Sequence, residues 1–495
     1  MSAYAPGYYR SPGDQFAPLL VVGLIIALAL SGLLVIAGAT VAVVALAGLV
    51  LAVAVFVRPA LAVYAVTLAV VFGDFHVADQ NQAAGAQMFE SLAKYGINFT
   101  PAEVLLICGL VGLLIRLTFD PSLRFRAGAM FTPIMLLIAA VALACVVGIA
   151  HSANMQTMRQ EVRGLFYVPV LYLLVTHYFA RRERFLYLMG VFVIAVNIAS
   201  VESIYRYYAH VRTYDLGLSQ SLAFAHENSL LYAAAIIIIL ARFVWAKHPL
   251  HEWKYLLLVP LPLVAMFVMH RRAGLVALDG GVALLCLVLL RQKMHTFLIF
   301  VPLALLAFGM VVAVTWNNQG SSGELARAVQ SVTNSNQLSA RDQSSDLYRQ
   351  REELNIRLNI EATPLLGKGF GRPYTFYVPV TDLSADWPLW NSVPHNSVLW
   401  FWLDAGVAGF IALTLLFAAA MMRSMQLLTR LADPLKPYAF AMGAIVLMFF
   451  MYSWVDLGLI TPRTLALFAL ALGGIAVLSG SDLNPSSPAP APEAG

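Results

Sequence analysis

The sequence contains few charged residues. They make up only 12% of its 495 residues, whereas soluble domains average about 25%. Hydrophobic residues make up 60%, and the mean hydropathy is +0.77. So little polar surface excludes an ordinary soluble domain, and we expect a membrane protein that crosses the bilayer many times.

Cysteine is also scarce. Cys108, Cys145 and Cys286 all lie in apolar runs, without the Cys-x-x-Cys or Cys/His spacing of a metal site. We interpret them as small buried hydrophobic residues. The net charge of +5 does not indicate nucleic acid as a partner, because in a membrane protein the positions of Lys and Arg set the topology.

The alternating ten-residue pattern of a membrane β-barrel is absent. A cleavable signal peptide is not expected either, because the first apolar run, from about Ala17, is long and is closely followed by another. Many runs instead reach the roughly 17 to 25 residues of a spanning helix. We therefore predict an all-α membrane bundle of about 14 transmembrane helices. The predicted spans are 18–36, 40–57, 60–73, 101–118, 131–150, 165–180, 185–205, 222–245, 255–269, 273–290, 296–315, 398–421, 437–456 and 463–479.

Lys and Arg indicate the orientation. If both termini are cytoplasmic, every inner connection is positive, while the short outer connections are poorer in Lys and Arg and mixed with acids. The expected organisation is a flexible cytoplasmic N-terminus (1–17), spans 1–11 (18–315), a large outer loop (316–397), spans 12–14 (398–479) and a disordered cytoplasmic tail (480–495).

The outer loop is expected to contain amphipathic helices. Residues 346–360 predict one such helix, with Leu347, Leu354, Ile356 and Leu358 on its apolar side and Arg349 available to solvent or a ligand. A shorter helix is predicted within 324–332. Glycines then predict a turn, at positions Gly367, Gly369 and Gly371. An aromatic cluster follows, suited either to the membrane interface or to stacking on sugars: Tyr374, Phe376, Tyr377, Trp387 and Trp390.

Several arginines and histidines depart from the topology rule because they fall on the predicted outer side. The outer set is Arg159, Arg163, Arg206, Arg212, His226, Glu227, Asn228, Arg271, Arg272 and His395. Guanidinium groups gathered at helix ends suit an anion site, since Arg stays charged and binds phosphate in bidentate fashion. The alternative for each arginine is pairing with a lipid phosphate or with a carboxylate such as Glu202 or Asp279.

Ordered motifs carry a resemblance to a known family. They are Arg272-Ala273-Gly274 at the head of a span, an Arg-rich helix in the outer loop, the Pro-Leu-Leu-Gly-Lys-Gly-Phe-Gly segment at 364–371, Pro-His-Asn-Ser at 394–397 and Ala-Gly-Val-Ala-Gly at 405–409. Over roughly residues 160–480 the chain resembles the O-antigen ligase and Wzy-type polymerase superfamily. It departs from the family pattern at His226-Glu227, where Asn-Pro is common, and at Arg271, where Ser is usual.

The resemblance implies a glycosyltransferase of the bacterial inner membrane that acts on the periplasmic face without a metal or other cofactor. Its donor would be a glycan on undecaprenyl diphosphate, and its acceptor a glycan or lipid A-core, within a layer of membrane lipids. By position, His395 resembles the catalytic histidine and Arg272 the arginine that binds the diphosphate. A second arginine corresponds to Arg212 or Arg206, with Arg212 preferred. Further candidate contacts are Arg271 for the diphosphate and His226, Asn228, Arg349 and Asn396 for substrate.

The chemistry of these residue types agrees with that role. A near-neutral histidine can remove the proton of a sugar hydroxyl as general base, and preorganised arginines can stabilise the charge that develops on a diphosphate. A direct displacement of this kind would invert the anomeric centre. The paired carboxylates of a glycosidase are not evident near His395.

Three other readings remain open. A Wzy-type polymerase would use the same site. A metal-dependent enzyme would need carboxylates, for which Asp74, His76 and Asp79 are the candidates. A transporter or flippase for a lipid-linked sugar would need polar residues through the middle of several spans, and the predicted spans contain few ionisable residues.

Overall fold

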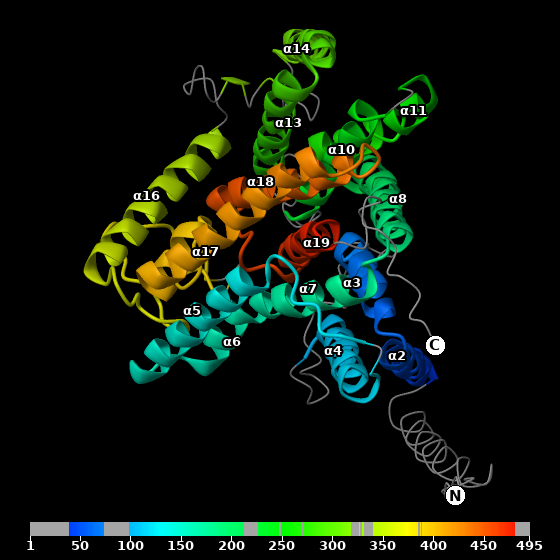
Figure 1. Cartoon of the computed structure of the whole chain (residues 1–495). Coiled ribbons are helices and arrows are strands. Elements are labelled where there is room, and N and C mark those ends of the chain that lie inside the picture. Colours follow the sequence, from blue (N-terminus) through cyan, green and yellow to red (C-terminus); the bar gives the residue numbers. More distant parts are fainter. Residues whose placement is uncertain are drawn as a thin grey trace, which may run out of the picture.

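Every regular element in the described part of the chain is helical, as predicted (Figure 1). The computed structural model describes residues 39–73, 99–121, 123–211, 226–246, 249–269, 271–317, 326, 329–330, 340–384, 387 and 389–480. The helices are α2 (Ala39–Val57), α3 (Ala60–Phe72), α4 (Pro101–Phe119), α5 (Phe131–Ala150), α6 (Met155–Arg163), η3 (Gly164–Phe166), α7 (Tyr167–Tyr178), α8 (Arg182–Arg206), η4 (Tyr207–Val211), α10 (Asn228–Val244), α11 (Pro249–Leu256), α12 (Pro260–Val268), α13 (Arg272–Gln292), α14 (Met294–Thr315), α16 (Ala340–Ala362), α17 (Ser397–Arg430), α18 (Lys436–Val455) and α19 (Pro462–Leu478).

Apolar helices coincide with all predicted spans except 18–36, which lies outside the described residues. Within the described ranges, seven helices are long and apolar enough to cross a membrane: α4, α5, α8 with its continuation, α13, α14, α17 and α18. The other apolar helices are shorter, so the count of 14 stays a prediction. The predicted span 255–269 is interrupted between Leu256 and Pro260, because the prolines at 260 and 262 lack the N–H that would continue a helix.

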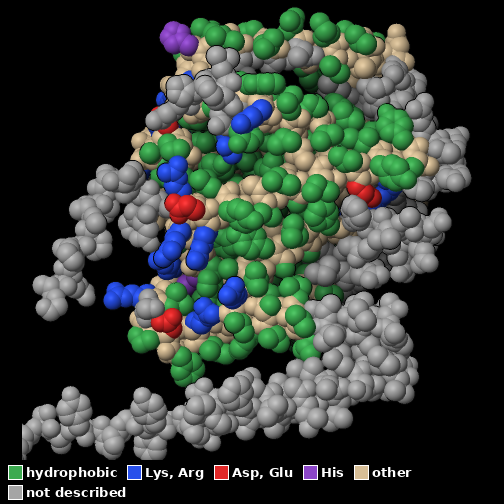
Figure 2. Space-filling view, turned by 90° about the vertical axis from the view of Figure 1, so that its right-hand side faces the viewer, with side chains coloured by type: hydrophobic (Ala, Val, Ile, Leu, Met, Phe, Trp, Pro, Cys, Tyr) green, Lys and Arg blue, Asp and Glu red, His purple; other side chains and the backbone are tan. Residues whose placement is uncertain are grey.

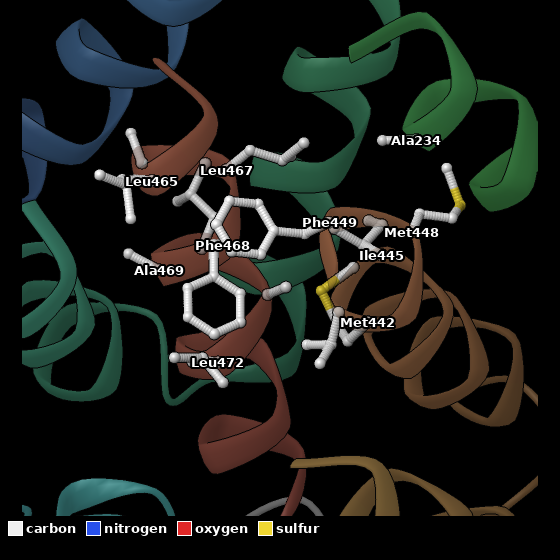
Figure 3. Close-up of a cluster of buried hydrophobic side chains, with 14 of the residues drawn as sticks. Ala234, Met442, Ile445, Met448, Phe449, Leu465, Leu467, Phe468, Ala469 and Leu472 are labelled. Atoms are coloured by element: carbon white, nitrogen blue, oxygen red, sulfur yellow. The ribbon is translucent and has the colours of Figure 1, made fainter. Parts of the chain in front are cut away.

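Helix α18 lies at the centre of the bundle and packs against α10, α13, α17 and α19. Phe449 of α18 stacks on Phe468 of α19 with ring centroids 4.4 Å apart (Figure 3). Small residues allow the helices to pack closely. At Gly474 of α19, for example, an added Cβ would lie 2.8 Å from the sulfur of Met442 in α18. Between membrane helices, where lipid is as apolar as the protein, such close packing supplies the stabilisation.

Lys and Arg side chains lie on the side of the bundle away from α16, toward which α17 runs. Figure 2 shows this side, the right-hand side of Figure 1, with basic side chains spread among apolar ones and a few acids. Predicted inner residues such as Arg58, Arg181 and Arg430 are exposed at helix ends. The orientation in the membrane stays a prediction from the positive-inside rule.

The predicted amphipathic helix of the outer loop is present and longer than expected. Helix α16 covers Ala340–Ala362 rather than 346–360, and it lies beside α17 (Figure 1). Ile356 and Ile360 pack with Leu399 and Leu403 of α17 in a small separate core. The predicted apolar side was wrong at Leu347 and Leu354, which are exposed because the face that meets α17 carries Ile356 and Ile360. Of the short helix predicted within 324–332, only residues 326, 329 and 330 are described, and they are helical.

Helix α17 is broken at Gly406, where φ is +62° and ψ is −167°. The predicted glycine turn enters this break: the N–H of Lys368 donates to the carbonyl of Leu403 at 2.8 Å, and the N–H of Gly369 to that of Asp404 at 3.1 Å. Lys368 also forms an ion pair with buried Asp404. The loop therefore holds residues 397–405 as a separate half-helix.

A carboxyl group from α6 completes this junction. Glu161 accepts the N–H of Gly371 and is buried. Burial and the negative charge of Asp404 raise the pKa of Glu161 to about 8, against the opposing effect of Lys368. A proton retained on Glu161 at neutral pH means that the single ammonium of Lys368 faces one buried negative charge rather than two.

We expect Gly406→Ala to lower the thermal unfolding midpoint of the purified protein, at a cost of about 1–3 kcal/mol. An added Cβ would lie 2.3 Å from the carbonyl oxygen of Leu365, at a φ that L-residues avoid. Gly190→Ala is the matched control, because its Cβ would meet no atom within 4 Å. An unchanged midpoint for Gly406→Ala would show that the break does not depend on glycine.

Candidate functional site

Three helices begin at one place on the predicted outer side: α10 at Asn228, α13 at Arg272 and α17 at Ser397. The hydroxyl of Ser397 lies 2.8 Å from the carbonyl of Asp456, which ends α18, and the Asp456 carboxylate contacts His226 before α10. The N-terminal ends of helices carry partial positive charge, so their meeting favours an anion.

Gly274 explains how α13 comes so close to α10. A Cβ at this position would lie 2.3 Å from the Cβ of Ser229, so only glycine fits. The small residue two positions after Arg272 thus permits this close helix packing. Arg272, at the start of α13, therefore lies at the same helix junction as His226 and Asn228.

His395 is held by a carboxylate that the sequence did not single out. Its Nδ1 lies 3.0 Å from Oε2 of Glu352, and its backbone N–H donates to the same oxygen at 3.0 Å. Glu352 is 2% exposed. An ionised carboxylate only accepts hydrogen bonds, so Nδ1 carries the proton and Nε2 of the neutral ring is left as the basic nitrogen. No described residue forms a hydrogen bond with Nε2.

Aromatic rings enclose the imidazole. Tyr348 and Trp387 meet it edge to face, with centroids 5.8 Å and 6.1 Å away. Burial raises the pKa of Tyr348, as do the charge of Glu352 and the hydrogen bond between them, so the phenol stays protonated and donates to Glu352. Glu352 thus accepts from the ring of His395, from its backbone and from Tyr348, which fixes the ring.

Arg272 binds a carboxylate in a forked arrangement. Its two terminal nitrogens lie 3.0 Å and 3.5 Å from the two oxygens of Asp346, and both side chains remain partly exposed. A phosphate group presents oxygens in a similar fork. The guanidinium is therefore oriented for bidentate binding of an anion at this surface.

A second histidine, His226, forms a similar histidine–carboxylate pair. Nδ1 of His226 lies 3.3 Å from Oδ2 of Asp456. Burial alone would raise the pKa of Asp456, but the hydrogen bond to His226, the charge of that imidazole and the charge of Arg349 lower the pKa to about 2. Arg349 is half-buried and forms no hydrogen bond with another described residue, so its donors are available to a ligand.

Helix α16 supplies one interaction partner each to Arg272, Asp456 and His395. Asp346 reaches Arg272, Arg349 acts on Asp456, and Glu352 holds His395. The three positions are three residues apart, which makes them neighbours on the helix surface at steps of about 4.5 Å. The site therefore lies between α16 and the starts of α10, α13 and α17.

The other predicted residues are less uniformly placed. Arg271 lies within electrostatic reach of Tyr452, together with Asp456. Arg206 donates from Nε to Glu202 at 2.9 Å, which is the carboxylate pairing considered from the sequence, and its binding to diphosphate stays a prediction. Arg212 lies outside the described residues.

Two asparagines have structural partners. Asn396 caps α17 by accepting the N–H of Leu399 at 3.1 Å, and its buried amide nitrogen forms no hydrogen bond with a described residue. Asn228 accepts from Arg463, which also donates to the carbonyl of Val70. Asn228 thereby ties α10 to α19 and α3.

Metal-ligating side chains do not cluster in the described ranges. These ranges contain no group of three or more His, Cys, Asp or Glu side chains that could hold a metal ion. The alternative ligands Asp74, His76 and Asp79 lie outside those ranges. The metal-dependent alternative therefore stays open to experiment.

Comparison with known families gives a match in the same region. The model of the O-Antigen ligase family matches residues 255–414, a segment that includes Arg272, α16, the glycine turn and His395. Residues 255–414 are thus similar to the O-antigen ligase family. No curated protein matches the chain significantly. The family match and the apolar helices indicate a multi-pass bacterial membrane protein with a ligase-type or polymerase-type function in polysaccharide biosynthesis.

Proposed function

We propose that the chain is a glycosyltransferase that moves a glycan from an undecaprenyl diphosphate carrier to a hydroxyl group of an acceptor sugar. The observation that carries the proposal is that one helix, α16, holds the imidazole of His395 at Nδ1 through buried Glu352 and contacts the guanidinium of Arg272 through Asp346. His395 and Arg272 both lie in the segment matched by the O-antigen ligase family. A base and an anion site are the two requirements of this reaction.

In the proposed reaction, Nε2 of His395 takes the proton of the acceptor hydroxyl. The hydroxyl oxygen forms a bond to the anomeric carbon as the bond from that carbon to the phosphate oxygen breaks. The electron pair of the broken bond leaves with the lipid diphosphate. Attack opposite the leaving group inverts the anomeric centre.

Charge on the diphosphate grows as that bond breaks, so cations placed in advance lower the barrier. Arg272 holds both oxygens of Asp346, and a diphosphate would compete with that carboxylate for the same donors. Arg271 and Arg349 add positive charge near the same junction, with Arg206 or Arg212 as a further candidate.

We place the protein in the bacterial inner membrane with this site on the periplasmic side. The support is the positive-inside rule, because the connections predicted to be inner are all basic and contribute exposed residues such as Arg58, Arg181 and Arg430. The donor carrier would then approach His395 and Arg272 through the membrane, and the acceptor would enter beneath α16.

The test is a transfer assay in membranes that contain the full chain, with an undecaprenyl diphosphate-linked glycan as donor. Lipid A-core carrying a single added glycan would identify a ligase, and a ladder of carrier-linked products a Wzy-type polymerase. A transporter would leave the donor chemically intact. Intact donor in the presence of either acceptor would contradict the proposal.

Transfer should continue unchanged, within about twofold, in excess chelator, because arginines rather than a metal ion are proposed to stabilise the diphosphate. The assay is run with and without EDTA and again after addition of Mg²⁺. Loss of transfer in EDTA with recovery in Mg²⁺ would favour the metal-dependent alternative.

A further inference from the structure

The site contains two histidine–carboxylate pairs, and the reaction above uses only one. In the second pair, Asp456 is 2% exposed while the side chain of His226 is 36% exposed. The buried partner holds Nδ1, and Nε2 forms no hydrogen bond with any described residue. His226 therefore presents an oriented nitrogen at an accessible surface, as His395 does.

Charged groups of both signs lie near the pair of His226 and Asp456. Asp456 is the charged group in direct contact. Arg349 of α16 acts electrostatically on Asp456. Arg271 before α13, Arg463 of α19 and Glu227 before α10 act on Tyr452, as Asp456 does. Asp456 is the negative group whose hydrogen bond stabilises an imidazolium, while the arginines make the surface attractive to an anion.

The two pairs lie at the same junction. Ser397, two residues after His395, contacts the carbonyl of Asp456 at 2.8 Å and accepts the N–H of Leu459 at 3.2 Å. One imidazole belongs to the start of α17 and the other to the start of α10. Helix α16 contacts the first through Glu352 and acts on the partner of the second through the charge of Arg349. A substrate in contact with both would lie across the starts of these two helices.

We propose that His226, oriented by Asp456, is the general acid of the reaction and donates its Nε2 proton to the departing diphosphate. The inference rests on the proposed function. His226 and Asp456 lie outside the segment matched by the O-antigen ligase family, so the match does not assign them a role.

Protons and electrons balance in this scheme. As the anomeric carbon–oxygen bond breaks, its electron pair remains on the phosphate oxygen, which takes the proton from Nε2 of His226. The acceptor hydroxyl gives its proton to Nε2 of His395. After release of products, His395 loses a proton to water and His226 regains one.

The test is the pH dependence of kcat for transfer from an undecaprenyl diphosphate-linked glycan, with the full chain in membranes. The wild-type profile should be bell-shaped, because His395 has to be neutral and His226 protonated. His226→Gln should lower kcat about a hundredfold and abolish the basic limb while it leaves the acidic limb in place. Asp456→Asn should move the basic limb to lower pH, because the imidazolium loses its negative partner.

The matched control is His295→Gln, an exposed histidine at the start of α14, which should reproduce the wild-type profile. If Asp456→Asn does not accumulate as folded protein, the His226→Gln profile decides alone. A wild-type basic limb in His226→Gln would overturn the inference and leave the proposed function standing. Absence of transfer in the wild-type protein would instead contradict the proposed function.

Discussion

His395→Ala should lower the rate of glycan transfer about 10²- to 10⁴-fold, the usual contribution of a general base. The loss should appear in kcat, because the acceptor hydroxyl can still bind but no longer has a group to receive its proton. Initial rates with an undecaprenyl diphosphate-linked glycan measure the effect. His295→Ala is the control for a histidine far from the proposed site, and undiminished transfer by His395→Ala would remove His395 from the mechanism.

Glu352→Gln tests the same base through its partner. The amide of Gln can donate to Nδ1, which would hold the ring in the tautomer with its proton on Nε2, where it cannot accept another. We expect a loss of similar size to that of His395→Ala and little further loss in the double variant. Glu353→Gln is the matched control, because the adjacent carboxylate pairs with Arg357 at the surface. Equal activities of the two Gln variants would show that Glu352 only stabilises α16.

Arg272→Ala should lower kcat about 10²- to 10³-fold, the effect of losing one preorganised donor to a developing negative charge. Growth of charge on the diphosphate in the transition state predicts a larger effect on kcat than on the donor KM. Arg272→Lys should recover only part of the rate, because a lysine cannot form the fork seen with Asp346.

The control for Arg272 is Arg357→Ala, an arginine of α16 that is 62% exposed. It should transfer at the wild-type rate. If Arg272→Ala raised the donor KM and left kcat unchanged, the arginine would bind the donor equally in the ground and transition states, and its role in catalysis would have to be abandoned.

Much of this arrangement of helices could be predicted from the sequence, because a membrane-spanning helix requires a long apolar run. The runs predicted helices close to α5, α13 and α18, and the placement of Arg272 and His395 on one side followed from the charge of the connections. The number of spans could not be predicted as securely, since several of the apolar helices are shorter than a bilayer requires.

The acids of the site could not be recognised in the same way. Asp346 and Glu352 lie in a charged helix where every acid looks solvent-exposed, and only the packing of Ile356 and Ile360 against α17 turns Glu352 inward and leaves Glu353 outside. The available signal was the spacing of Asp346, Arg349 and Glu352 by three residues. Asp456 was visible only as an ionisable residue near a span end.

The three contacts of α16 limit how this loop can be exchanged. Because a helix turns by about 100° per residue, inserting or deleting one residue between Asp346 and Glu352 would rotate one partner away from Arg272 or from His395. Chimeras designed to change the acceptor by grafting an outer loop from a related enzyme therefore need to keep this spacing, whatever side chains they introduce between these positions.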